Sequence, residues 1–215
     1  MKSAWQPVIR SGVLLALIAL IGTAVLVFVH EKTRDRIALQ EERRVLRQLN
    51  EIVPQSSYDN ALQTDRVEIE DPAFFRGGEP VIVYRARRGG RPVAVIMRVT
   101  APDGYNGDIH LLVGIDASGT VLGVRVTEHR ETPGLGDLIE IKKSRWVTHF
   151  KGTSLAHPQG RGWAVKRDGG DFDQFTGATI SPRAVVKAVH NALEYFGTHR
   201  RLLFKAPAET VVPHG

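Results

Sequence analysis

An uninterrupted apolar run stands near the start of the chain, and a longer segment of mixed character follows it. Residues 11–29 carry no charge and are rich in Leu, Val, Ile and Ala. A run of this length is enough for one helix to cross a bilayer. A cleaved signal peptide is the competing interpretation, but its apolar region is normally shorter and ends at a small-residue cleavage site. Here the run passes directly into the polar residues 30–35. We therefore expect an uncleaved transmembrane anchor.

Residues 30–54 are predicted to form a juxtamembrane helix. Pro54 is expected to end it, because proline lacks the N–H group that an interior helical position needs. The segment is either a solvated spacer that packs on the following domain or a docking helix for neighbouring subunits, and the pattern favours the spacer. Its apolar stripe consists of Val45, Leu49, Ile52 and Val53, with Ile37 a few turns earlier.

Two β-hairpins are predicted after the polar and irregular residues 55–78. Each has two segments enriched in Val and Ile, as strands are, around a turn that contains glycine. The four expected strands are residues 80–86, 92–100, 109–115 and 121–127.

A further helix is predicted to start near Ser181. A serine suits the N-cap position, and Pro182 suits the first helical position, where the missing N–H has no partner to lose. The residues that follow show apolar side chains at helical spacing. They are Val185, Val186, Val189, Ala192, Leu193 and Phe196.

These elements predict one α+β domain over residues 55–205, with an antiparallel sheet and packed helices, after a short tail at residues 1–10. Within the domain, residues 138–150 are expected to be helical, and residues 163–166 are expected to form a short strand. The tail at residues 206–215 is expected to be mobile.

Composition narrows the possible chemistry. The 215 residues include no cysteine, which excludes disulfides, iron–sulfur clusters, thiolate metal sites and a cysteinyl flavin linkage. The eight histidines form no His-x-x-x-His pair, so we expect no metal site. The formal charge is +6, but no nucleic-acid motif accompanies it, so we expect no nucleic-acid partner. Contact with anionic lipid headgroups accounts for part of the basic excess equally well.

The flanking charges bear on topology. Two basic residues precede the apolar run, and more follow it. The positive-inside rule by itself would therefore place the following domain in the cytoplasm. The residues are Lys2 and Arg10 before the run, and Lys32, Arg34, Arg36, Arg43, Arg44 and Arg47 after it.

Thr179 is the strongest candidate for a site. It stands just before the predicted start of a helix, where unpaired N–H groups and the helix dipole favour an anion. Gly177 and Ala178 leave room for a bulky group to approach the backbone. This predicts a phosphate-linked ligand beside Thr179. An ordinary glycine-containing turn before a capped helix is the alternative.

Polar neighbours of Thr179 suggest further roles. Thr176 and Ser181 are candidates for phosphate hydrogen bonds, although backbone capping is their simpler role. Asp173 is a candidate to orient the loop or to assist a metal-dependent attachment of such a ligand, although its simpler role is to stabilise a turn. The nearby cations are candidates to bind an oxyanion, although each is more commonly a solvated charge. They are Lys166, Arg167 and Arg183.

Residues 173–181 resemble the flavinylation motif of the FMN-binding domain family, Asp-x-x-Ser/Thr-Gly-Ala-Thr-x-Ser/Thr. The matching positions are Asp173, Thr176, Gly177, Ala178, Thr179 and Ser181. Two further segments, residues 104–116 and 129–137, resemble the G subunit of the Rnf ion-translocating electron transport complex. The C subunit of the sodium-pumping NADH:quinone reductase carries the same attachment motif, but the Gly-Tyr-Asn-Gly sequence at residues 104–107 and the compact length favour the Rnf subunit.

The resemblance implies covalent FMN, joined by a phosphoester to Thr179 and installed from FAD by a flavin transferase with the help of a metal. It also implies that the loop at residues 131–136 forms the wall of the isoalloxazine site, through Glu131, Thr132, Leu135 and Gly136, with Tyr105 near it. His129, next to this loop, is expected to be a structural, hydrogen-bonded histidine.

The function implied by the resemblance is electron transfer in a membrane complex. The expected partners are the other Rnf subunits, which couple electron exchange between ferredoxin and NAD to ion movement. The resemblance places the chain in the inner membrane as a single-pass protein with its C-terminal domain in the periplasm, against the charge distribution. The protein is then a carrier without catalytic residues of its own. The alternative is an anchored sensory or assembly module that binds a flavin or another anion without redox turnover.

Overall fold

The computed structural model describes residues 5–76 and 80–213. The chain forms two compact units, Met1–Val45 and Leu46–Gly215. Residues 1–4 of the expected N-terminal tail, residues 214–215 of the expected C-terminal tail and the side chain of Ile37 lie outside the described part.

The first element is a single helix, α1 (Trp5–Asn50), which contains both the expected anchor and most of the expected juxtamembrane helix. Within it, Val8–Thr33 is long and apolar enough to cross a membrane, with a mean hydropathy of 2.9. None of that window is buried by protein, as expected of side chains that face lipid. The helix ends at Asn50, four residues before Pro54.

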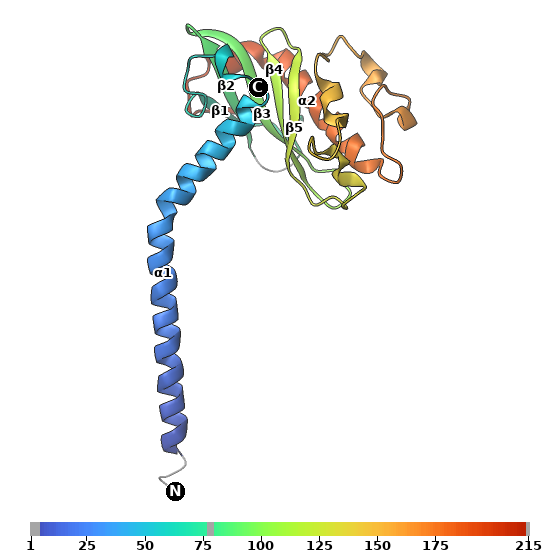
Figure 1. Ribbon diagram of the computed structural model, residues 1–215. Coiled ribbons are helices and arrows are strands. Elements are labelled where there is room, and N and C mark those ends of the chain that lie inside the picture. Colours follow the sequence, from blue (N-terminus) through green and yellow to red (C-terminus); the bar gives the residue numbers. More distant parts are fainter. Residues whose placement is uncertain (1–4, 77–79, 214–215) are drawn as a thin grey trace. The chain divides into compact units, whose positions relative to one another are not determined.

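The second unit contains a six-stranded sheet in the order β5-β4-β3-β2-β1-β6 (Figure 1). Both predicted hairpins are confirmed: β2 pairs antiparallel with β3, and β4 with β5. The pairing of β3 with β4 joins the two hairpins into one antiparallel sheet. The strands are β2 (Val81–Arg88), β3 (Arg91–Ala101), β4 (Ile109–Asp116) and β5 (Val121–Glu128).

Two short strands were not expected. β1 (Arg66–Glu70) lies in the stretch expected to be irregular, where Val67 and Ile69 alternate with charged residues, and it pairs antiparallel with β2. β6 (Val211–Pro213) lies in the tail expected to be mobile and pairs with β1 in parallel. Both depend on pairing with a neighbour, since three to five residues with few apolar side chains give little signal of their own.

Helix α2 (Ile180–Lys205) crosses one face of the sheet and confirms the predicted C-terminal helix (Figure 1). Its apolar residues pack with inward-facing strand residues such as Val113 and Ile115 in the main core. The opposite face is covered in part by the chain after α1. There Ile52 approaches Gly114 so closely that a Cβ on Gly114 would lie 2.1 Å from Ile52 Cγ2. Gly114 lies on this opposite face, because neighbouring residues of a strand point to opposite faces.

The expected helix over residues 138–150 is wrong. The segment instead forms two short 3₁₀ helices, Gly136–Ile139 and Trp146–Phe150. Ser144 separates them, because its Oγ donates to the Leu138 carbonyl (2.6 Å) and accepts the Trp146 N–H (3.1 Å). Such side-chain contacts compete with the backbone bonds of a longer helix.

The expected strand at residues 163–166 is also wrong. Val165 makes only an isolated bridge with Phe172, and a 3₁₀ turn, Lys166–Asp168, begins at once. The Lys166 N–H donates to the Phe172 carbonyl (2.7 Å), so the segment closes on itself rather than joining the sheet. Gly169, at φ = 87°, allows this tight reversal.

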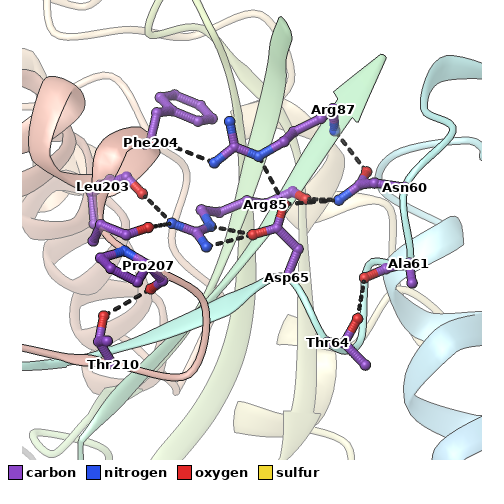
Figure 2. A network of polar contacts seen from close by, with 11 residues as sticks. Asn60, Ala61, Thr64, Asp65, Arg85, Arg87, Leu203, Phe204, Pro207 and Thr210 are labelled. Atoms are coloured by element: carbon purple, nitrogen blue, oxygen red, sulfur yellow. Dashed lines mark hydrogen bonds and ion pairs between the residues drawn. The ribbon is translucent and has the colours of Figure 1, made fainter. Parts of the chain in front are cut away.

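The C-terminal end of α2 is held by a network around two arginines of β2 and Asp65 (Figure 2). Arg85 is 2% exposed, pairs with Asp65 (2.5 Å) and donates to the carbonyls of Leu203 (3.0 Å) and Ala206 (2.6 Å). Arg87 pairs with the same carboxylate (2.7 Å) and donates to the Phe204 carbonyl (2.7 Å). Carbonyls at a helix end lack intrahelical partners, and cations are favoured there. This network fixes α2 to the sheet.

Candidate functional site

Three loops that are far apart in the sequence meet around one cavity of about 300 Å³. They are the β3–β4 loop, the loop that follows β5, and the loop that enters α2. The lining residues are Tyr105, Glu131, Thr132, Leu135, Gly136, Gly177, Ala178, Thr179, Ile180 and Ser181. The structure therefore brings together the three segments on which the family resemblance depends.

Thr179 is the N-cap residue of α2, with φ = −89° and ψ = −27°. The expected cap, Ser181, is instead the second residue of the helix and is 1% exposed, so this part of the prediction is wrong. Pro182 is then the third helical residue. It still lies in the first turn, where a backbone N–H would have no intrahelical acceptor. The Thr179 side chain makes no capping hydrogen bond. The first two amide groups of the helix, those of Ile180 and Ser181, lie next to Thr179, at positions that have no intrahelical acceptor.

Glu131 links all three loops. Its side chain is buried at 5% exposure. One carboxylate oxygen, Oε1, accepts the backbone N–H of Asn106 (3.1 Å), and the other, Oε2, accepts the hydroxyl of Ser181 through a short hydrogen bond. A second contact, from Asn106 Nδ2 to Thr132 Oγ1 (3.3 Å), joins the same two loops. The sequence placed Glu131 in the cavity wall, but its bridging role became visible only in the structure.

Close packing around Glu131 explains two of the glycines. A Cβ on Gly136 would lie 2.6 Å from Ser181 Oγ and 2.7 Å from Glu131 Oε2. A Cβ on Gly104 would lie 2.1 Å from the Gly107 carbonyl oxygen. Real Cβ atoms are not found at these separations, so any larger residue would separate the loops.

His129 is hydrogen-bonded to the loop that follows β5. Its Nδ1 accepts the backbone N–H of Glu131 (3.0 Å), and its Nε2 lies 2.9 Å from Glu140 Oε1. Because Nδ1 is an acceptor here, the ring proton resides on Nε2 and is donated to Glu140. This agrees with the structural role expected for His129.

The three cations near Thr179 differ in what they contact. Arg167 donates from Nη1 to Thr179 Oγ1 at 3.4 Å. Lys166 pairs instead with Asp173 (2.6 Å), and both side chains are 56% exposed. Thr176 is also exposed. The cavity lining does not include Lys166, Asp173 or Thr176. The structure therefore does not bring Lys166, Asp173 and Thr176 to the cavity with the other predicted residues.

Arg183, the third cation, is engaged by Asp168 through two hydrogen bonds of 2.6 and 2.9 Å. The hydrogen bond from Arg183 holds the pKa of the Asp168 carboxyl below its ordinary value, and the same contact raises the pKa of Arg183. Its charge is therefore already compensated. Among the three cations, Arg167 is the one whose charged group contacts the Thr179 hydroxyl.

The cavity has an apolar rim. Tyr105 is 65% exposed, and Leu135 and Ile180 are each 41% exposed, although all three are large apolar or aromatic side chains. Exposed groups of this kind around a cavity are typical of a ligand site. Ile180 was not predicted to be a site residue. Its apolar side chain between Thr179 and Ser181 was the sequence feature that could have indicated this role.

These features fit an FMN group. The planar ring system would have apolar side chains to contact, and the phosphate would have Thr179 Oγ, the Arg167 guanidinium and the start of α2 near it. Gly177, at φ = 80°, keeps the backbone open beside Thr179.

Comparisons with known proteins identify the family of the chain. Residues 104–194 match the FMN-binding domain family, and residues 1–52 match the RnfG N-terminal region. The chain is 49% identical to the G subunit of the ion-translocating oxidoreductase complex of Pseudomonas aeruginosa, over 95% of both chains. It is 47% identical to the corresponding G subunit of Shewanella loihica, over 97% of this chain and 99% of the relative. The chain therefore belongs to the G-subunit family of Rnf ion-translocating electron transport complexes, whose members contain an FMN-binding domain.

Proposed function

We propose that the chain is the flavin-bearing electron-transfer subunit of an Rnf-type complex and that it carries FMN through a phosphoester to Thr179 Oγ. The observation that supports this most directly is the position of Thr179. Its hydroxyl lies at the cavity that the three family segments enclose, at the start of α2 and within 3.4 Å of the Arg167 guanidinium.

The attachment reaction would use FAD and a flavin transferase. The Thr179 Oγ–phosphorus bond forms on the FMN phosphate, the pyrophosphate P–O bond of FAD breaks, AMP leaves, and the hydroxyl proton passes to solvent. The product keeps one negative charge next to Arg167. A guanidinium that already contacts the threonine oxygen is well placed to stabilise that charge.

Bound FMN would supply the redox chemistry, accepting and releasing electrons at its ring. The residues of this chain determine where that ring lies. Leu135, Ile180 and Tyr105 present apolar surface to it, and Glu131 and Ser181 fix the loops that carry them. Because a covalent bond prevents loss of the group, the site remains loaded on a side of the membrane where free flavin is scarce.

Mass spectrometry of the native protein tests the attachment. The tryptic peptide of residues 168–183 contains Thr179. We expect it to carry the mass of FMN less one water, with fragments that assign the addition to Thr179. An unmodified peptide from protein made with an active transferase would contradict the proposal.

Arg167→Ala is expected to lower the fraction of flavin-loaded protein and to slow transfer from FAD roughly tenfold, since an exposed charge-assisted hydrogen bond of about 1.5 kcal/mol is lost. Lys166→Ala is the matched control, because it removes the adjacent cation, which pairs with Asp173. Transfer rates measured with purified transferase give the comparison. Equal effects of the two substitutions would mean that general charge near the loop, rather than the contact with Thr179, is responsible.

The proposed partners are the other Rnf subunits, which exchange electrons with ferredoxin and NAD and couple this exchange to ion movement. The proposed location of the C-terminal domain is the periplasm. A phosphatase reporter fused to the C-terminus is expected to be active only if that orientation holds. Activity of a cytoplasmic reporter at the same position would support the charge-based topology instead.

A further inference from the structure

Glu131 is a buried anion in the wall of the flavin cavity. Its side chain is 5% exposed and forms no ion pair within the part of the chain that the structure describes. Both oxygens accept hydrogen bonds from neutral groups, the Asn106 N–H and the Ser181 hydroxyl. Neither contact brings a compensating positive charge to the carboxylate.

Another buried carboxylate nearby shows the contrast. Asp137 is also 5% exposed, but it lies 3.6 Å from Lys143 Nζ and is absent from the cavity lining. Its charge is therefore partly compensated and lies outside the cavity lining. Glu131, in contrast, lines the cavity and has no such cation beside it among the described residues.

We propose that Glu131 is a positioning and potential-setting residue, which keeps the reduction potential of the flavin on Thr179 low. This inference rests on the proposed attachment at Thr179. Electrons that arrive on the ring without a full complement of protons leave negative charge on it. A buried carboxylate in the wall of the same cavity repels that charge and so disfavours reduction. The donor and acceptor of those electrons remain the partner subunits, and Glu131 itself takes no part in the electron transfer.

The replacement Glu131→Gln separates charge from structure. A glutamine can keep both contacts, because Oε1 still accepts the Asn106 N–H and Nε2 donates to Ser181 Oγ once that hydroxyl turns. Only the negative charge is lost. The matched control is Glu140→Gln, since Glu140 is a carboxylate of the same region that contacts His129 and lies outside the cavity lining.

Ser181→Ala gives a shift of opposite sign. It removes the hydroxyl that partly screens Glu131 and leaves the charge in place, so the field at the cavity becomes more negative. A purely structural loosening would move the potential in the same direction in both variants. Opposite shifts therefore identify an electrostatic cause.

The experiment is a spectroelectrochemical titration of full-length, flavin-loaded protein in detergent at neutral pH. In Glu131→Gln, we expect the ratio of reduced to oxidised flavin at a fixed potential to rise roughly tenfold, which is about 30 mV for a two-electron couple. Glu140→Gln should change the ratio of reduced to oxidised flavin far less, and Ser181→Ala should lower that ratio.

The outcomes separate the two proposals. Wild-type protein without flavin on Thr179 overturns the attachment and the inference together. Flavin on Thr179 with an unmoved potential in Glu131→Gln, or with the same shift in Glu140→Gln, overturns only the inference. If Glu131→Gln does not retain flavin, Ser181→Ala decides, since a potential that is unchanged or higher overturns the inference and a lower one supports it.

Discussion

Protein with Thr179→Ala, made together with its flavin transferase, is expected to give a completely dark band when a denaturing gel is scanned for flavin fluorescence. Wild-type protein should give a bright band. The loss should be total, because the two other hydroxyls of the attachment motif cannot replace that of Thr179. The Ser181 hydroxyl is buried and donated to Glu131, and Thr176 is outside the cavity lining.

Thr179→Ser is the control for this result. It keeps an oxygen nucleophile at the start of α2 and should therefore retain a fluorescent band. All three proteins should be extracted in equal amounts, since the Thr179 side chain makes one contact, at 3.4 Å, with an exposed arginine. A bright band in Thr179→Ala would place the flavin elsewhere and would contradict the proposed attachment.

The second large effect is expected from Arg85→Ala, which should destabilise the domain by about 3–5 kcal/mol, the range for breaking a buried charge pair. The substitution leaves Asp65 without its buried partner and leaves the carbonyls of Leu203 and Ala206 without their donor (Figure 2). Thermal unfolding followed by near-UV circular dichroism in detergent should show a midpoint on the order of 10 °C lower.

Arg85→Lys should restore only part of this stability. A single ammonium group cannot reach the carboxylate and both carbonyls as the planar guanidinium does. Lys187→Ala is the control for loss of an exposed charge, because Lys187 and Asp103 are each about half exposed and such pairs contribute about 0–1 kcal/mol. A similar midpoint for Arg85→Ala and Lys187→Ala would contradict the stabilising role of the network.

Strong local periodicity explains what the sequence could predict of the fold. The hairpins β2–β3 and β4–β5 and the helix α2 were predicted because Val and Ile recur at strand spacing and the apolar residues after Ser181 recur at helical spacing. The segment at residues 138–150 also has apolar residues at helical spacing. There, however, the Ser144 hydroxyl hydrogen-bonds the Leu138 carbonyl and the Trp146 N–H, so these groups do not form the backbone bonds of a longer helix. Helix propensity does not reveal such side-chain contacts. β1 and β6 form only because a neighbour is present.

The candidate site was predictable in its parts but not in its assembly. The resemblance identified Glu131, Thr132, Leu135 and Gly136, and all four line the cavity together with Thr179. Hydrogen bonds between residues 25 and 50 positions apart in the chain determine the arrangement, as in the contacts of Glu131 with Asn106 and Ser181. No local pattern encodes such partners. For the same reason, sequence proximity overestimated the role of Lys166, which pairs with Asp173.

The network around Arg85 has a consequence for biogenesis. The backbone oxygens that receive its guanidinium lie 118 and 121 residues later in the chain. While the ribosome is still making the intervening segment, the carbonyl groups that accept hydrogen bonds from Arg85 do not yet exist. Burial of the guanidinium at that stage would leave donors without acceptors, which costs free energy. Arg85 therefore gains its full set of partners only when the end of α2 has been made. Thr179 lies directly before α2, so the residue proposed to carry the flavin and the partners that bury Arg85 belong to the same late part of the chain.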